Sequence, residues 1–193
     1  MRIRSLLIGI AVSATALLAP TAAQAAPGGS VATVDLTGLT SAIADRLALA
    51  DTVAASKRAS GAAIDDPVRE QVVLDSVSLL AVERELDPAY VRMVFRDQIE
   101  ASKTVQRGLF EVWSSPGGMP PSGSPDLGPV RTAINALNVE IVDQLAAQET
   151  ILSGGLCLPG LAGSTAVTIG VKQLDPLHIA GQIQAETSLC GAP

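Results

Sequence analysis

Aromatic residues are nearly absent from this sequence, in which Tyr90, Phe95, Phe110 and Trp113 are the only four. A surface on which nucleic-acid bases or sugars could stack is therefore not expected. Histidine is scarcer still, since His178 is the only one, so we expect neither a metal site nor a Ser-His-Asp triad. The core must be aliphatic, and the abundance of Ala and Leu favours helices over sheets.

Long apolar runs are missing beyond the first 25 residues. Arg2 and Arg4 form a basic start, Leu6 to Leu18 is apolar but short for a membrane span, and Ala23-Gln24-Ala25 fits a small-x-small cleavage site. These features predict a signal peptide over residues 1–25, with an uncleaved anchor as the alternative. We expect a secreted or periplasmic protein that makes no membrane contact after cleavage.

Basic charge is the third shortage. Without Arg2 and Arg4, 11 of the 13 Lys and Arg residues remain against 19 Asp and Glu, a net charge near −8 for residues 26–193. Nucleic acid is not expected as a partner, because its binding needs a basic face. These 168 residues are enough for a single domain with its own core.

The two cysteines, Cys157 and Cys190, both lie near the C-terminal end. In an oxidising compartment an even pair predicts a structural disulfide. A metal or redox pair is the alternative, but CxxC spacing and nearby histidines are lacking. On the chain-entropy account, closing this loop stabilises the fold by about 3–4 kcal/mol.

Apolar residues recur every three or four positions over four long stretches, which predicts helices at 36–60, 66–85, 88–113 and 126–152. Their length is typical of a helical bundle. In the second helix the predicted core residues are Val68, Val72, Leu79, Leu80 and Val82.

The segments between and after these helices are less regular. Residues 114–125 hold four prolines and three glycines and are predicted to be a loop. Residues 161–173 mix Gly, Ser, Thr and Val, which allows either a helix or a strand. Asp175-Pro176 starts a last predicted helix that ends at Leu189, so the bundle has about six helices, with a C-terminal hairpin at 156–190.

Several polar residues have spacings that suit a binding site. Arg46 and Lys57 are eleven residues apart, close to three turns, so they share one helix face. Ser102 and Gln106 are four apart and also share a face. The others lie in or just before the first turns of the second and fourth helices: Asp66, Arg69, Glu70 and Arg131. Individually, each could be a solvated charge, a helix cap or a surface polar group; together they suit a small dianion.

Five motifs in register carry a family resemblance. They are RLALAD and VAASK in the first helix, D-x-x-R-E at Asp66 to Glu70, LDPAYVRMVFRDQIEASKTVQ at 86–106, and PDL-x-x-x-R at 125–131. With them, the chain resembles the all-helical AroQ-type chorismate mutases, and within them the secreted gamma subclass, which has a signal peptide and a C-terminal disulfide. The resemblance covers residues 36–152, and the cysteines extend it to Cys190.

The resemblance implies a site and a reaction. Arg46 and Arg131 match arginines that hold substrate carboxylates, Arg69 a further site arginine, and Ser102 a polar contact to a carboxylate. Lys57 and Gln106 match donors to the ether oxygen of the breaking bond. Asp66 and Glu70 match acids on the hydroxyl side. Some secreted members carry Glu where this chain has Gln106 and lack the acid matching Glu70, so here the pattern follows the short intracellular members.

The implied activity is the rearrangement of chorismate to prephenate by a homodimer. An intramolecular rearrangement requires no nucleophile, metal or cofactor, only a held conformer and donors to the ether oxygen. Isochorismate pyruvate-lyase chemistry on the same fold, or a non-catalytic secreted binding module, are the alternatives.

Overall fold

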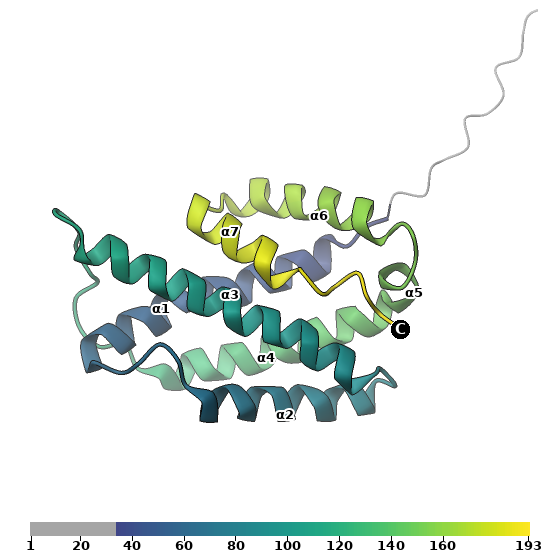
Figure 1. Cartoon of the computed structure of the whole chain (residues 1–193), viewed down its shortest axis with the longest axis horizontal. Helices are drawn as coiled ribbons and strands as arrows, with labels where there is room; N and C mark the ends of the chain where they lie inside the picture. Colours follow the sequence, from purple (N-terminus) through teal and green to yellow (C-terminus); the bar gives the residue numbers. More distant parts are fainter. Residues whose placement is uncertain (1–33) are drawn as a thin grey trace, which may run out of the picture. The chain divides into compact units, whose positions relative to one another are not determined.

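The structure is a computed structural model that describes residues 34–193. The predicted signal peptide at 1–25 lies outside the described residues. Within them the chain forms helices and no strand (Figure 1), so the all-α prediction is confirmed. The seven helices are α1 Thr37–Ser60, α2 Pro67–Glu83, α3 Pro88–Ser114, α4 Leu127–Ala147, α5 Glu149–Leu152, α6 Cys157–Lys172 and α7 Pro176–Ala185.

Three details differ from the predicted six helices. The last helix, α7, ends at Ala185 instead of Leu189. The fourth helix ends at Ala147 instead of Leu152, and a single turn, α5, follows it. The segment that allowed helix or strand is the helix α6. Its Gly, Ser and Thr residues reduce intrinsic helix preference, so tertiary packing decides its conformation.

Aspartates begin four of the helices, three of them followed directly by proline. The side chain of Asp66 accepts a hydrogen bond from the backbone N–H of Arg69 (3.0 Å), and that of Asp87 accepts from Ala89 (2.8 Å). Asp126 and Asp175 cap α4 and α7 in the same way. These caps satisfy N–H groups that a helix start leaves unpaired. At the other end of α1, Gly61 adopts φ +70°, a left-handed conformation that ends the helix.

Helices α1 and α3 lie at the centre of the bundle (Figure 1). Helix α1 packs against α3, α4, α6 and α7, and α3 packs against α2 and α7. The predicted apolar stripe of α1 is fully buried: Leu36, Leu39, Ile43, Leu47, Ala50 and Ala54. These two helices therefore set the position of everything attached to them.

The predicted core face of α2 is wrong for four of its five residues. Val68, Val72, Leu79 and Val82 are exposed, and the residues that α2 buries are Val73, Leu74, Val77 and Ala81. Helix α2 is apolar on two sides, so periodicity alone identifies two stripes. The contacts with α3 select the one that faces inward.

The C-terminal hairpin is closed by the predicted disulfide between Cys157 and Cys190, whose Cα atoms are 5.6 Å apart. Helix α7 approaches α1 and α3 closely, because a Cβ at Gly181 would lie 2.9 Å from side-chain atoms of Leu47 and Val105. The Gln182 amide also donates a hydrogen bond to the carbonyl of Thr40 in α1 (2.9 Å). No helix among residues 34–193 is long and apolar enough to cross a membrane.

His178 joins α7 to α1 through two carboxylates. Its Nδ1 lies 2.7 Å from Asp175 and its Nε2 lies 3.0 Å from Asp51. Both ring nitrogens can donate only in the protonated imidazolium. The hydrogen bond to Asp51, helped by Asp175, raises the pKa of His178 to about 9 despite the opposing effect of burial.

This clamp predicts a pH-dependent stability. The folded pKa lies above that of an unfolded histidine, about 6.5, so the contribution is complete below pH ~6.5 and is lost as the pH rises through about 9. We expect the free energy of unfolding to fall by about 1–2 kcal/mol over this range. The fall is smaller than the pKa difference alone implies, because water partly screens both carboxylates. Urea unfolding of the wild type and of His178→Gln at several pH values measures it. Equal pH slopes in the two proteins would contradict the clamp.

Candidate active site

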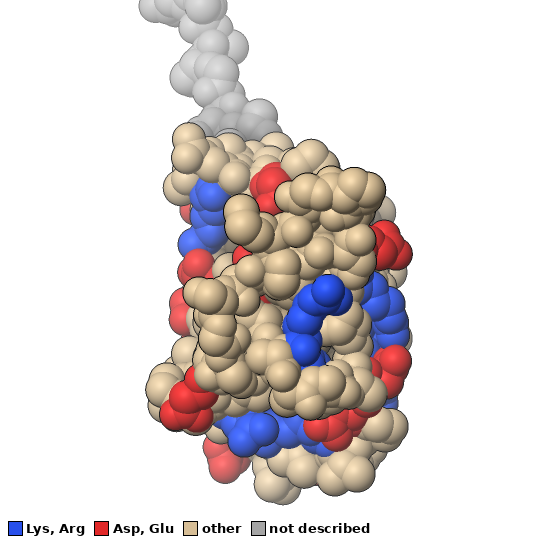
Figure 2. All heavy atoms as spheres, turned by 90° about the vertical axis from the view of Figure 1, so that its left-hand side faces the viewer, with Lys and Arg blue, Asp and Glu red and all other residues tan. Residues whose placement is uncertain are grey.

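One cavity of about 140 Å³ lies between α1, α2, α3 and α4. All eight residues that the sequence nominated for a site line it: Arg46, Lys57, Asp66, Arg69, Glu70, Ser102, Gln106 and Arg131. Apolar side chains complete its wall, among them Val53, Val73 and Ile99. Figure 2 faces the end of the bundle at which α1 ends and α4 begins, where basic and acidic side chains lie side by side.

Arg46 is the most deeply buried cation of the cavity, with 7% of its surface exposed. Its Nε donates to the Asn138 side chain on α4 (2.9 Å), and Nη1 donates to the Gln98 carbonyl on α3 (3.4 Å). The guanidinium also lies 5.7 Å from the centre of the Phe95 ring. Desolvation lowers its pKa to about 10, so it stays charged at neutral pH.

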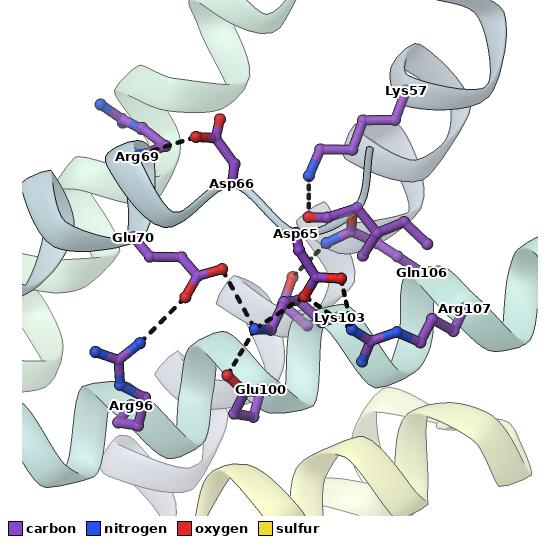
Figure 3. Close-up of polar contacts among 12 residues, drawn as sticks. Lys57, Asp65, Asp66, Arg69, Glu70, Arg96, Glu100, Lys103, Gln106 and Arg107 are labelled. Carbon is purple, nitrogen blue, oxygen red and sulfur yellow. Dashed lines mark hydrogen bonds and ion pairs between the residues drawn. The ribbon is translucent and has the colours of Figure 1, made fainter. Parts of the chain in front are cut away.

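Lys57 lies on the same face of α1 as Arg46 and lines the same cavity, as their spacing predicts. Its ammonium donates to the backbone carbonyl of Ile64, in the turn between α1 and α2 (Figure 3). Partial burial lowers its pKa, and the charges of Asp66, Asp65 and Glu70 oppose that effect. Two N–H donors of the ammonium remain for a ligand.

Arg69 and Arg131 enter the cavity from the starts of two helices. Arg69 is in the first turn of α2, and Arg131 follows shortly after the start of α4. A cation near a helix N-terminus is disfavoured by the helix dipole. Asp66 bonds the backbone of Arg69 and not its guanidinium, which has no carboxylate partner within residues 34–193.

The pairing of charges separates the cavity from the rest of the surface. Among residues 34–193, six of the 11 Lys and Arg residues form salt bridges: Arg84, Arg92, Arg96, Lys103, Arg107 and Lys172. The other five form none, and four of these line the cavity. The fifth, Arg58, lies over the Phe110 ring and bonds Ser114. An acidic protein therefore keeps four of its five unneutralised cations around one cavity, where an anion would neutralise them.

Glu70 is held firmly at the cavity wall. Its Oε2 accepts from Arg96 (3.1 Å) and its Oε1 from Lys103 (3.3 Å), both on α3 (Figure 3). The side chain is 15% exposed. It can still accept a hydrogen bond from a ligand hydroxyl, because each carboxylate oxygen has more than one lone pair.

Gln106 and Ser102 bond each other on one face of α3. The Gln106 Nε2 donates to the Ser102 Oγ (3.1 Å), while the buried Gln106 Oε1 has no partner among the described residues. Turning the amide over would let the Ser102 hydroxyl donate to Oε1 and would present Nε2 to the cavity. The pair can thus supply a donor to a ligand without leaving a polar atom unpaired.

Two residues of the site were missed in the sequence. Lys103 lines the cavity and is buried, although a lysine between Ser102 and Gln106 has no spacing that distinguishes it from a surface charge. Asn138, which orients Arg46, is 2% exposed on an otherwise apolar stripe of α4. Its position between Leu137 and Ile141 was the one available signal.

Comparisons with known proteins agree on one family. The profile described as chorismate mutase type II matches residues 30–107. A secreted chorismate mutase of Mycolicibacterium smegmatis is 39% identical over 88% of this chain and 96% of its own length, and one of Mycobacterium tuberculosis is 33% identical over 96% and 90%. The crystal structure of a Burkholderia thailandensis chorismate mutase superposes with a TM-score of 0.76 at 33% identity, covering 80% of this chain and 98% of that one.

The positions of two unneutralised cations at opposite helix ends predict opposite effects on stability for two matched substitutions. Arg69→Gln removes a charge from the first turn of α2 and should raise the free energy of unfolding by about 0.3–1 kcal/mol. Arg58→Gln removes one from the last turn of α1 and should lower it slightly. Urea unfolding measures both.

The same pair tests anion binding. A small dicarboxylate should raise the melting temperature of the wild type and of Arg58→Gln, and should do so much less for Arg69→Gln. Equal stabilisation of all three proteins would rule out Arg69 as an anion contact.

Proposed function

The chain belongs to the type II chorismate mutase family, and we propose that it rearranges chorismate to prephenate in the cavity between α1 and α4. The observation that carries the proposal is the gathering of four unneutralised cations and Gln106 around one cavity. Chorismate carries two carboxylates, a hydroxyl and an ether oxygen. The cavity offers a group of matching chemistry for each.

The reaction needs position and electrostatics from the protein. It is an intramolecular [3,3] rearrangement in which one C–O bond breaks while one C–C bond forms, so nothing is added or removed. Arg46, Arg69 and Arg131 hold the two carboxylates and thereby the compact conformer, which lowers the entropic part of the barrier. Asp66 and Glu70 accept from the hydroxyl.

Negative charge builds on the ether oxygen as its bond to carbon breaks. Lys57 and Gln106 are the donors we assign to that oxygen, from α1 and α3 on two sides of the cavity. Donors fixed before the reaction stabilise such charge without reorganising. Neither a cofactor nor a metal is needed for any of these steps.

We propose in addition that the protein is exported. The predicted signal peptide at residues 1–25 supports this, as do the relatives named secreted chorismate mutases and the disulfide between Cys157 and Cys190. A disulfide of this kind forms and persists in an oxidising compartment.

A direct assay tests the activity. The purified chain, mixed with chorismate, should consume it and form prephenate, and Lys57→Met should lower kcat by about 10²–10³-fold because a donor to the breaking bond is lost. A folded wild-type protein without turnover would sink the enzymatic proposal in favour of a binding module. Release of pyruvate from isochorismate would favour the lyase.

The pH dependence tests the role of Gln106. Its amide donates at every pH, so wild-type activity should persist above neutral pH and decline only in the alkaline range, below the ordinary lysine pKa of about 10.4, as Lys57 loses its proton. Gln106→Glu can donate only when protonated, so its activity should be confined to acidic pH. A wild-type rate that drops steeply between pH 5 and 8, with the fold intact, would contradict the assignment.

We further propose that two copies form a homodimer through α2. Four large apolar side chains lie exposed along this helix: Val68, Val72, Leu79 and Val82. A two-fold axis would place the same stripe of each protomer against the other. Sedimentation equilibrium should give twice the protomer mass for the wild type and the single mass for Leu79→Glu. A dimeric Leu79→Glu would rule out this face.

A further inference from the structure

Lys103 is a buried cation at the cavity wall that the proposed reaction does not use. Its side chain is 11% exposed, and its ammonium lies 2.6 Å from Glu100, 3.3 Å from Asp65 and 3.3 Å from Glu70 (Figure 3). Burial lowers its pKa, but the hydrogen bonds to Glu100, Asp65 and Glu70 outweigh burial and raise it. Lys103 is therefore a fixed positive charge.

The charge of Lys103 is already neutralised. The cluster around it consists of Lys103, Arg96 and Arg107 on α3 with three carboxylates: Asp65, Glu70 and Glu100. Three cations thus balance three anions. In contrast to the four unpaired cations of the cavity, Lys103 has little charge to offer a dianionic ligand.

Within this cluster, Lys103 is the partner of Glu70 that lies inside the cavity. The other partner, Arg96, has a half-exposed side chain and does not line it. Glu70 extends from α2 into the cavity, and both partners of its carboxylate lie on α3, so the direction of that carboxylate depends on what holds it from α3. The Lys103 ammonium and the Arg96 guanidinium each hold a different oxygen of that carboxylate.

We propose that Lys103 is a positioning residue for Glu70, which rests on the proposed function. By holding Oε1, Lys103 fixes the Glu70 carboxylate in one orientation. In that orientation the lone pairs of its oxygens that Lys103 and Arg96 do not use face the substrate hydroxyl. A carboxylate held only by Arg96 on the protein surface could rotate away from the cavity, and a displacement of this size at a contact group slows an oriented reaction. Lys103 acts through Glu70 and does not touch the substrate.

The test compares four single variants and one double variant with the wild type by steady-state kinetics on chorismate. Lys103→Met removes the ammonium and keeps the apolar stem. It should fold, because Glu70 keeps Arg96, Asp65 keeps Arg107, and Glu100 reaches solvent. Arg107→Gln is the matched control, since it removes the other partner of Asp65 on the same helix and leaves the pair between Lys103 and Glu70 untouched.

We expect Lys103→Met to lower kcat/KM by about 10-fold and Arg107→Gln to change it less than about 3-fold. Lys103→Arg, which keeps a cation within reach of Glu70, should recover most of the loss. Glu70→Gln should divide its effect between kcat and KM in the same proportion as Lys103→Met does.

The double variant Lys103→Met with Glu70→Gln decides between mechanisms. If Lys103 acts through Glu70, the double variant equals Glu70→Gln alone. If Lys103→Met lowers kcat/KM as much in the Glu70→Gln background as in the wild type, Lys103 acts directly on the substrate charge and the proposal is overturned. A Lys103→Met protein as active as the wild type would also overturn it. A wild type without any turnover would overturn the proposed function and this inference together, whereas the other outcomes leave the function standing.

Discussion

The buried guanidinium of Arg46 is the interaction on which the arrangement of the cavity depends. It projects from α1, bonds a side chain of α4 and a backbone carbonyl of α3, and faces the Phe95 ring. A buried charge is costly unless its donors are satisfied, so these three helices must keep their relative positions for the domain to hold it. None of the contacts is a carboxylate, so the charge itself stays available to the cavity. One residue thus joins three walls of the site, and its positive charge remains free to bind an anion.

The other cations of the domain differ in whether they pair with a carboxylate. Outside the cavity, Arg84 pairs with Asp143 and Lys172 with Asp45, and at the cavity wall Lys103 pairs with three carboxylates. The other four cations of the cavity, Arg46, Lys57, Arg69 and Arg131, form no such pair with any carboxylate of residues 34–193. Fixed dipoles and apolar walls around unpaired cations suit a bound anion, because water screens charges less there than at an open surface. Unpaired cations lower the stability of the empty protein, and an anion that binds the folded state raises it.

Much of this structure was predictable because its signals are local. The Asp-Pro pairs locate helix starts, the α1 stripe identifies its buried face, and the eleven-residue spacing of Arg46 and Lys57 puts both into one cavity. What failed depends on packing across the chain. The two apolar sides of α2 look alike in sequence, and its contacts with α3 and α4 decide that Val73 is inside and Val72 outside. Lys103 was missed for the same reason, because its partners Asp65 and Glu70 lie more than 30 residues away along the chain.

The C-terminal hairpin contributes no residue to the cavity, yet it positions both halves. Helix α6 holds the start of α1, where the backbone N–H of Leu36 donates to Ser164 and Thr40 bonds Thr168. The last residues hold α3, since the Tyr90 hydroxyl donates to the carbonyl of Leu189, next to the disulfide. Helix α1 carries Arg46 and Lys57, and α3 carries Ser102 and Gln106, so the crossing of these two helices sets the distance between the cations and the amide donor. A disulfide that closes the hairpin therefore stabilises the geometry of a site to which it adds no atom.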